Sequence, residues 1–225
     1  MSNFFFNTVL NNININAVFQ TGMYAPAVLA KIVEINRKIT SLYFYPYKPK
    51  RNLKEGRTHW PIPMSRLLYH DASVKKLKLR REEITWDKIW STIGLLENHY
   101  VLGVLSEVQA GKKRPHIPMM DFDDNNNLAQ IECFLRAIGQ KGVVLESGRS
   151  YHFYGIKLMD DRQWLKFMGD CLLSGLVEPR YLGHRLKDEL CILRVSACPL
   201  RPKVPTVVSI VTKEIPKNAA LMVIK

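Results

Sequence analysis

The chain has 225 residues, of which 47% are hydrophobic and 24% are charged, and its formal net charge is +13. This composition is typical of a globular chain with a sizeable core. The sequence has no run of about 18 apolar residues, the length that a membrane-spanning helix needs. The first residues lack the basic segment of a signal peptide, and the four cysteines lack the spacing of a zinc site or a disulfide framework. We therefore expect a cytoplasmic protein with reduced thiols.

The first part of the chain is predicted to be rich in helix. Hydrophobic spacing indicates a helix over residues 24–37, a strand over 40–47 and a second helix that begins near Thr85 as its N-cap. A connection rich in Pro, Gly and Lys separates the strand from the second helix. We define residues 1–99 as a basic, helix-rich N-terminal region, which is either a separate subdomain or an extension packed on the sheet that follows.

The pattern changes at residue 100, where strands begin to alternate with helices. Two hairpins are predicted, one joining 100–108 to 116–123 and one joining 143–147 to 150–155. The other elements are helices over 125–139, 161–174 (Asp161 as cap, Gly175 as stop) and 179–187, and strands over 191–196 and 206–210. Hairpins separated by helices indicate an α+β class, with an antiparallel sheet backed by helices over residues 100–225.

The positive charge is concentrated in one stretch, since residues 37–88 contain 14 Lys and Arg against 5 Asp and Glu. Tyr43, Tyr45, Tyr47 and Trp60 interleave with these charges, a pattern that favours single-stranded nucleic acid bound by phosphate contacts and base stacking. A solvated basic surface and a membrane-surface site are the alternatives, and alternate tyrosines would equally face a core from a strand. The candidate nucleic-acid contacts are Lys48, Lys50 and Arg51.

A pair of aspartates closes the strand PMMDFD. Alternation places Asp121 and Asp123 on the same strand face, where two carboxylates suit a divalent cation such as Mg²⁺ or Mn²⁺. A polar loop that caps the next helix is the other interpretation, and we prefer it for Asp124. It explains Asp121 less well, because apolar residues surround this carboxylate in the sequence and a lone core carboxylate is costly.

The second candidate constellation is the segment from Ser147 to His152, SGRSYH. Ser150 and His152 share one face of the following strand, and Gly148 permits the tight turn before it. A Ser–His hydrolytic dyad is disfavoured because the order does not match the GxSxG elbow. Two interpretations of His152 stay open: it is a structural residue, or it contacts a phosphate together with the neighbouring Arg149.

The order of these motifs resembles the archaeo-eukaryotic primase superfamily, including its primase-polymerase members. The matching residues are MMDFD (119–123) and SYH (150–152), about 30 residues apart, each on a predicted strand. The resemblance covers roughly residues 100–211 and implies an RRM-like sheet. It also implies that Asp121 and Asp123 bind the catalytic Mg²⁺ or Mn²⁺, that His152 contacts the phosphates of the incoming nucleotide, and that Ser150 and Arg149 line the phosphate pocket.

A third acidic position of the family lacks a clear counterpart after His152. The family has a hydrophobic residue followed by Asp, and the pairs available are Met159-Asp160 and Val177-Glu178. Because Asp160 is interpreted as a helix cap, Glu178 is the weak candidate for the third metal ligand. Arg194 lies on the strand where that carboxylate is expected. It suits either a nucleotide or template phosphate, or an ion pair within the sheet.

The resemblance implies nucleotidyl transfer, in which nucleoside triphosphates extend single-stranded or primed DNA or RNA, with DNA replication as one biological setting. Two other functions stay open. One is a degenerate member that binds nucleic acid or nucleotides without extending chains, and the other is a metal-dependent nuclease, since paired carboxylates also serve hydrolysis.

Overall fold

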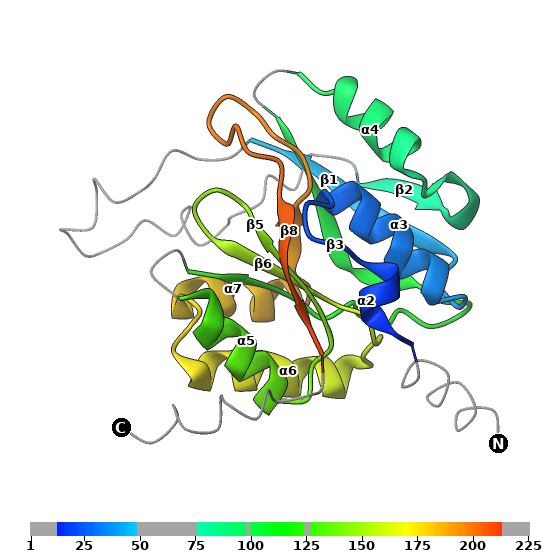
Figure 1. Cartoon of the computed structure of the whole chain (residues 1–225). Helices are drawn as coiled ribbons and strands as arrows, with labels where there is room; N and C mark the ends of the chain where they lie inside the picture. Colours follow the sequence, from blue (N-terminus) through cyan, green and yellow to red (C-terminus); the bar gives the residue numbers. More distant parts are fainter. Residues whose placement is uncertain (1–12, 49–75, 98–99, 124–126, 213–225) are drawn as a thin grey trace.

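The computed structural model describes residues 13–48, 76–97, 100–123 and 127–212 (Figure 1). Its helices in chain order are α2 (Ile15–Val18), α3 (Ala25–Ile35), the 3₁₀ turn η3 (Arg81–Glu83), α4 (Trp86–Gly94), α5 (Leu128–Ala137), α6 (Asp161–Ser174) and α7 (Pro179–Asp188). Its strands are β1 (Ser41–Tyr47), β2 (Leu77–Arg80), β3 (Val101–Gln109), β4 (Met119–Phe122), β5 (Gly142–Glu146), β6 (Tyr151–Gly155), β7 (Ile192–Arg194) and β8 (Thr206–Val211). None of the helices in these ranges has the length and hydropathy that crossing a bilayer requires.

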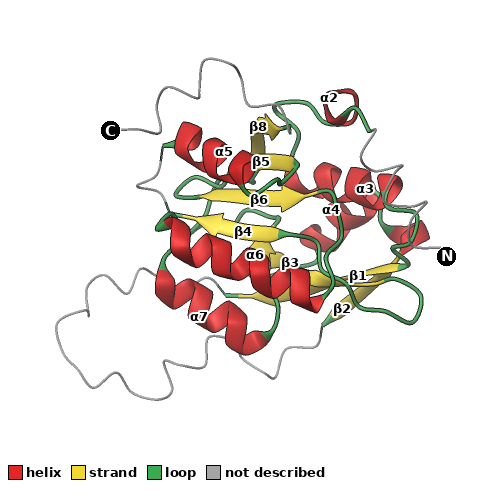
Figure 2. Ribbon diagram, turned by 90° about the horizontal axis from the view of Figure 1, so that it is seen from below, coloured by secondary structure: helices red, strands yellow, loops and turns green. Residues whose placement is uncertain are grey.

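The first sheet has the strand order β2-β1-β3-β7, and all its neighbours are antiparallel. Side chains alternate along β1: Leu42 and Phe44 are fully buried in the hydrophobic core, whereas Tyr43 and Tyr47 point to the other face and are half-buried. Helices α3 and α4 pack against each other and lie on one side of this sheet (Figures 1 and 2).

The second sheet has the order β4-β6-β5-β8 and is also antiparallel. One face is covered by α5 and α6, as seen from below in Figure 2, through the ring contacts Phe122–Phe134 and Phe153–Phe167. Residues one position earlier on the same strands, Asp121 and His152, therefore lie on the opposite face. The edge strands β4 and β7 contact each other, so the two sheets meet there.

The α+β class and the antiparallel pairing are confirmed, and so is the hairpin formed by β5 and β6. The other predicted hairpin forms only near its turn, where residues 106–110 run antiparallel to 113–117 and the Val108 amide donates to the Pro115 carbonyl. Beyond that turn the prediction is wrong, because β4 pairs with β6 and belongs to a different sheet from β3. The cap of α6 is also corrected: Asp160 is the N-cap and accepts from the Gln163 amide, while Asp161 is the first helical residue.

The division at residue 99 stays a prediction, although strands from both sides of it share the first sheet. Strand β1 pairs with β3 over most of its length, with Leu42 opposite Val108 and Tyr47 opposite Val101. A single hydrophobic core runs through both sheets and the helices that cover them. The packing of the described residues thus makes β1 and β2 an integral part of the sheet that carries β7.

A buried histidine joins three elements beside this core. His116 Nε2 faces Asp161 Oδ1 at 3.5 Å, and because a carboxylate only accepts, we place the ring proton on Nε2. Nδ1 then accepts from the hydroxyl of Ser106, 3.2 Å away, whose oxygen also accepts the Cys191 amide, and the ring stacks on Trp164. Ser106 is fully buried, so this Ser–His–Asp arrangement is structural and out of reach of a substrate.

We predict that this network makes stability depend on pH. Burial lowers the pKa of His116, although Asp161 opposes the shift. Below its unfolded pKa of about 6.5 the unfolded chain binds a proton that the folded chain does not, so the free energy of unfolding falls as the pH is lowered. Urea unfolding of wild type and His116→Asn, each measured at pH 7 and pH 5, should show a smaller loss on acidification in the variant. An identical loss in both proteins would contradict the assignment.

Candidate active site

The candidate site lies between the inner faces of the two sheets, where β4 of the second sheet meets β7 of the first. In the β4–β6 ladder Asp121 stands directly opposite His152, and their side chains are adjacent, with Nε2 3.6 Å from Oδ1. The sequence analysis predicted both residues as site residues, and the register brings them together across two strands. Tyr154 follows His152 on the same face.

The Asp121 carboxylate is held in an apolar setting. Burial raises its pKa to about 6, while a hydrogen bond from Ser150 and the charge of Arg194 pull it down and Asp123 pushes it up. Its Oδ1 atom is buried and accepts no hydrogen bond from the described residues, yet the side chain as a whole is 34% exposed. The carboxylate is thus reachable from solvent and has one oxygen that lacks a partner.

His152 is a neutral residue at physiological pH. Burial, helped by the charge of Arg194, lowers its pKa to about 3. The ring is nearly inaccessible to solvent, and its Nδ1 atom has no hydrogen-bond partner among the described residues. A neutral imidazole in this position offers one donor and one acceptor but no charge.

Arg194 connects the two sheets at the site. From β7 its guanidinium donates to the Ser147 carbonyl in the second sheet at 2.6 Å, to the Lys203 carbonyl at 2.6 Å and to the Ser196 carbonyl. The side chain is buried, which lowers its pKa, and the nearby Tyr47 and Asp121 oppose that shift. The sequence analysis gave Arg194 two possible roles, a phosphate contact or an ion pair within the sheet. In the structure the guanidinium binds main-chain carbonyls instead of forming that ion pair.

The turn between β5 and β6 is held tightly at its base. The Ser147 amide and hydroxyl both donate to the Ser150 carbonyl at 2.9 Å, and the two serine hydroxyls are 2.8 Å apart. Gly148 has a φ of +100°, a conformation that other residues rarely adopt, and Lys203 packs beside it. Arg149 is exposed at the tip, so its side chain is available to an anion in solution.

Tyrosines complete the site: the sequence analysis placed Tyr47 among the base-stacking candidates and gave no role to Tyr154 or Tyr181. Burial raises the pKa of Tyr47 to about 12 and that of Tyr154 beyond the usual range, and in both cases Arg194 and Asp121 are close enough to contribute. The hydroxyls of Tyr154 and Tyr181 are buried without a hydrogen-bond partner in the described structure. Strand alternation from His152 to Tyr154 was the available signal; for Tyr181 we find none.

The remaining predicted residues lie farther from this centre. Asp123 is exposed just after β4, and its amide donates to the Leu176 carbonyl. Glu178 is exposed at the N-cap of α7 and makes no side-chain cap there. Lys48 lies over the ring of Tyr100, whereas Lys50, Arg51 and Trp60 fall outside the described residues.

A metal ion fits the two aspartates chemically, although the described part of the chain contains no group of three His, Cys, Asp or Glu side chains placed to bind one. The orphaned Oδ1 of Asp121 is an acceptor that a hard cation would satisfy, and Asp123 supplies a second carboxylate near the same strand end. Glu178 does not join them in the described structure. The remaining ligands would have to come from water or from a bound phosphate.

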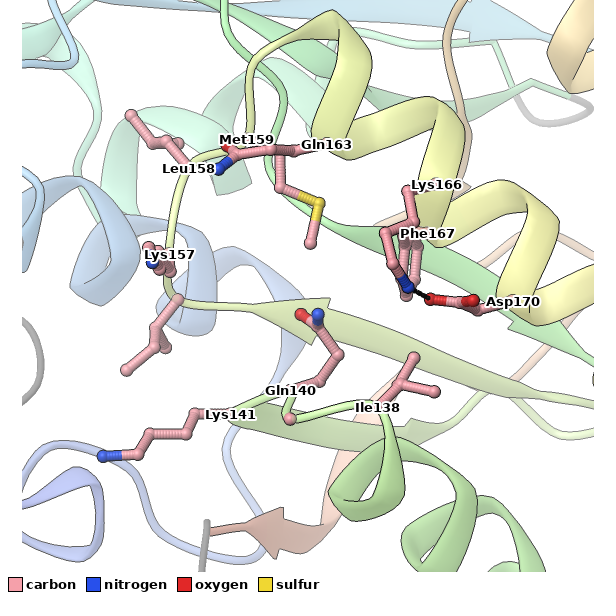
Figure 3. Close-up of a pocket in the computed structure, with 12 residues that line it drawn as sticks. Ile138, Gln140, Lys141, Lys157, Leu158, Met159, Gln163, Lys166, Phe167 and Asp170 are labelled. Atoms are coloured by element: carbon pink, nitrogen blue, oxygen red, sulfur yellow. Dashed lines mark hydrogen bonds and ion pairs between the residues drawn. The ribbon is translucent and has the colours of Figure 1, made fainter.

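A separate pocket of about 270 Å³ lies at the other end of β6 (Figure 3). Met159 and Gln140 line it, and an ion pair between Lys166 and Asp170 lies on its α6 wall. It contains none of the predicted site residues. The candidate site is therefore distinct from this pocket.

The arrangement defines an α+β protein with an acidic strand end within electrostatic reach of a buried arginine. The family model "AEP-like: Archaeo-eukaryotic primase 1D-like" matches residues 80–206, more than half of the chain, and the protein belongs to this family. Among solved structures, the AEP domain of the cyanophage S-2L primase-polymerase is similar with a TM-score of 0.45 and 13% identity, over 86% of this chain and 94% of that one. No curated protein matches the sequence.

We predict that Arg194 stabilises the fold and that Arg149 does not. Replacing Arg194 by Met leaves three carbonyls and the nearby Asp121 without their cation, which we expect to cost about 3 kcal/mol of unfolding free energy. Arg149→Met changes an exposed side chain on the β5–β6 turn that Arg194 binds, and it should alter the free energy of unfolding by less than about 0.5 kcal/mol. Chemical unfolding of both variants checks this, and equal effects would contradict the bridging role.

Proposed function

We propose that this chain is a nucleotidyltransferase of the primase-polymerase type that depends on a divalent metal ion and acts on nucleic acid. Family membership gives the class of protein, and one observation supports activity at this site: Asp121 has a buried oxygen without a hydrogen-bond partner among the described residues, on a strand end shared with Asp123. We also propose a cytoplasmic location and, as one setting, a role in DNA replication.

In the proposed reaction the 3′-hydroxyl of a primer or first nucleotide attacks the α-phosphorus of a nucleoside triphosphate. The bond from the 3′-oxygen to the α-phosphorus forms, the hydroxyl proton passes to water, the bond from the α-phosphorus to the oxygen that bridges it to the β-phosphate breaks, and pyrophosphate leaves. A bound Mg²⁺ or Mn²⁺ would lower the pKa of the hydroxyl and offset the charge that develops on the phosphate oxygens. Asp121 and Asp123 would hold it, with Glu178 as the weak third candidate.

The turn between β5 and β6 is the proposed phosphate pocket. Gly148 lets the main chain approach an anion closely, Arg149 supplies an exposed positive charge, and Ser150 lies at the base of the turn, where its hydroxyl is bonded to Asp121. Arg194 acts mainly through this turn, because its bond to the Ser147 carbonyl fixes where the turn begins. A nucleotide phosphate bound here would lie next to the Asp121 carboxylate, to which Ser150 donates.

We propose two roles for His152 at the same site, a contact with nucleotide phosphate and the positioning of the Asp121 carboxylate. The family resemblance implies that it contacts nucleotide phosphates, and its neutral ring is able to donate a hydrogen bond to one. Its low exposure and its position 3.6 Å from Asp121 Oδ1 support an additional effect, the positioning of that carboxylate. The basic segment that includes Lys48, Lys50 and Arg51 would hold template or primer through phosphate contacts.

A second candidate function has one observation in its favour. Within the described residues no third carboxylate converges on Asp121 and Asp123, so the metal would be weakly held in the absence of nucleotide. A member of the family that binds nucleotides or nucleic acid without extending chains is therefore the alternative. A metal-dependent nuclease, the other hypothesis, requires the same two carboxylates and differs only in the product.

We predict that Asp121→Asn and Asp123→Asn each abolish incorporation of labelled nucleotides into a primed template in the presence of Mn²⁺. Each change removes one negative charge from the proposed metal site with little change in volume. Nucleic-acid binding should stay within about twofold of wild type, because the phosphate contacts lie elsewhere. Incorporation, retention without incorporation, or cleavage of the template distinguishes the three candidate functions.

Asp170→Asn is the matched control for this experiment. This carboxylate lies on α6 beside the separate pocket and pairs with Lys166, so incorporation should not change. Wild-type incorporation by both site variants would remove Asp121 and Asp123 from the metal site.

A further inference from the structure

Three aromatic rings form a column on the surface of the first sheet's helical side. Trp86 and Trp90 are one turn apart on α4, with ring centroids 5.0 Å apart and planes 14° from parallel. Tyr24, the N-cap of α3, stacks on Trp86 at 5.8 Å and 24°. The column thus continues across two helices that are far apart in sequence.

Both ends of this column are open to solvent. Tyr24 is 44% exposed and Trp90 is 42% exposed, whereas Ile89 on the same helix is fully buried. Helix α4 therefore needs Ile89 for its packing, but it does not need the outer face of Trp90. Large aromatic rings exposed in a row are costly in water and usually mark a binding surface.

The column lies at the end of the loop that borders the candidate site. This loop joins β7 to β8. Arg194 binds the carbonyls of Ser196, near the start of the loop, and of Lys203, near its end. Two residues after Lys203, the Pro205 carbonyl accepts the Ala25 amide. Tyr24 forms a bridge with Thr206 at the same point. A strand leaving the candidate site along this loop, past Arg201 and Lys203, would reach the column.

We propose that Tyr24, Trp86 and Trp90 are a stacking site for the bases of single-stranded nucleic acid. This inference rests on the proposed function, which makes nucleic acid the substrate. A nucleobase has a flat π-face that extends a column of nearly parallel rings, and stacking of this kind tolerates any sequence. Helix α4 carries both Asp87 and Lys88, so stacking supplies the binding here, while the chain's net charge of +13 attracts the strand.

The test compares a fluorescently labelled single strand of 20 nucleotides with an abasic strand of equal length and charge. Trp90→Ala should weaken binding of the base-bearing strand about tenfold, and it should leave binding of the abasic strand unchanged. Because the contact is not ionic, the dependence of log K on log salt concentration should keep its wild-type slope. Trp90→Phe keeps a ring and should recover most of the affinity.

Leu95→Ala is the matched control, because Leu95 is apolar, lies at the end of the same helix and is 87% exposed, but has no ring. It should bind both strands as wild type does. Thermal unfolding of each variant checks that the fold is intact. Unchanged binding by Trp90→Ala, equal weakening for both strands, or the same loss in Leu95→Ala would each overturn the stacking site.

Three further outcomes separate the possible partners and the two proposals. A wild-type chain that dimerises while Trp90→Ala stays monomeric, with equal affinity for the single strand, would assign the surface to a second copy and overturn this inference. Asp121-dependent incorporation together with unchanged binding by Trp90→Ala would overturn the stacking site alone. A wild-type chain that neither binds the strand nor incorporates nucleotides would overturn the proposed function first.

Discussion

The guanidinium of Arg194 joins the two sheets, and the candidate site depends on that junction. A buried cation is stable only where donors are satisfied and a negative charge is near, and here three main-chain carbonyls and Asp121 meet this need. The same charge draws the pKa of Asp121 down against burial, and it adds to the burial that lowers the pKa of His152 and keeps the ring neutral. Fold and chemistry are therefore coupled: the bond that fixes the β5–β6 turn also sets the electrostatics beside the proposed metal ligands.

Much of the fold and the centre of the site were predictable from local patterns. Helical spacing predicted α3 and α4. The order of two motifs on strands singled out Asp121 and His152 as candidates, and the β4–β6 ladder places these two residues opposite each other. Strand β2 was not predicted from the sequence, because its alternating Leu and basic residues resemble a charged segment. Charged side chains are common on edge strands such as β2, since they discourage pairing with another chain. The division into two sheets depends on long-range pairing of β3 with β1 and β7, which no local pattern encodes.

Long-range contacts also explain which features of the site could not be predicted from the sequence. Arg194 was assigned to phosphate or to an ion pair, because the carbonyls that it binds are main-chain groups and leave no mark in the sequence. Tyr47 and Tyr181 reach the site only because β1 and α7 converge on it, through contacts between residues far apart in the chain. The family match fixes the class of protein, and the acidic pair without a third carboxylate in the described residues makes metal binding the decisive property.

The central claim is that Asp121 and Asp123 bind a catalytic divalent cation beside a nucleotide held by the β5–β6 turn. Anomalous diffraction at the manganese edge, from crystals grown with Mn²⁺ and a non-hydrolysable nucleoside triphosphate, tests it most directly. The account predicts a manganese peak in contact with the Asp121 carboxylate and triphosphate density against Gly148, Arg149 and Ser150. Triphosphate density in the pocket beside Met159, or well-ordered triphosphate with no manganese at Asp121, would contradict it.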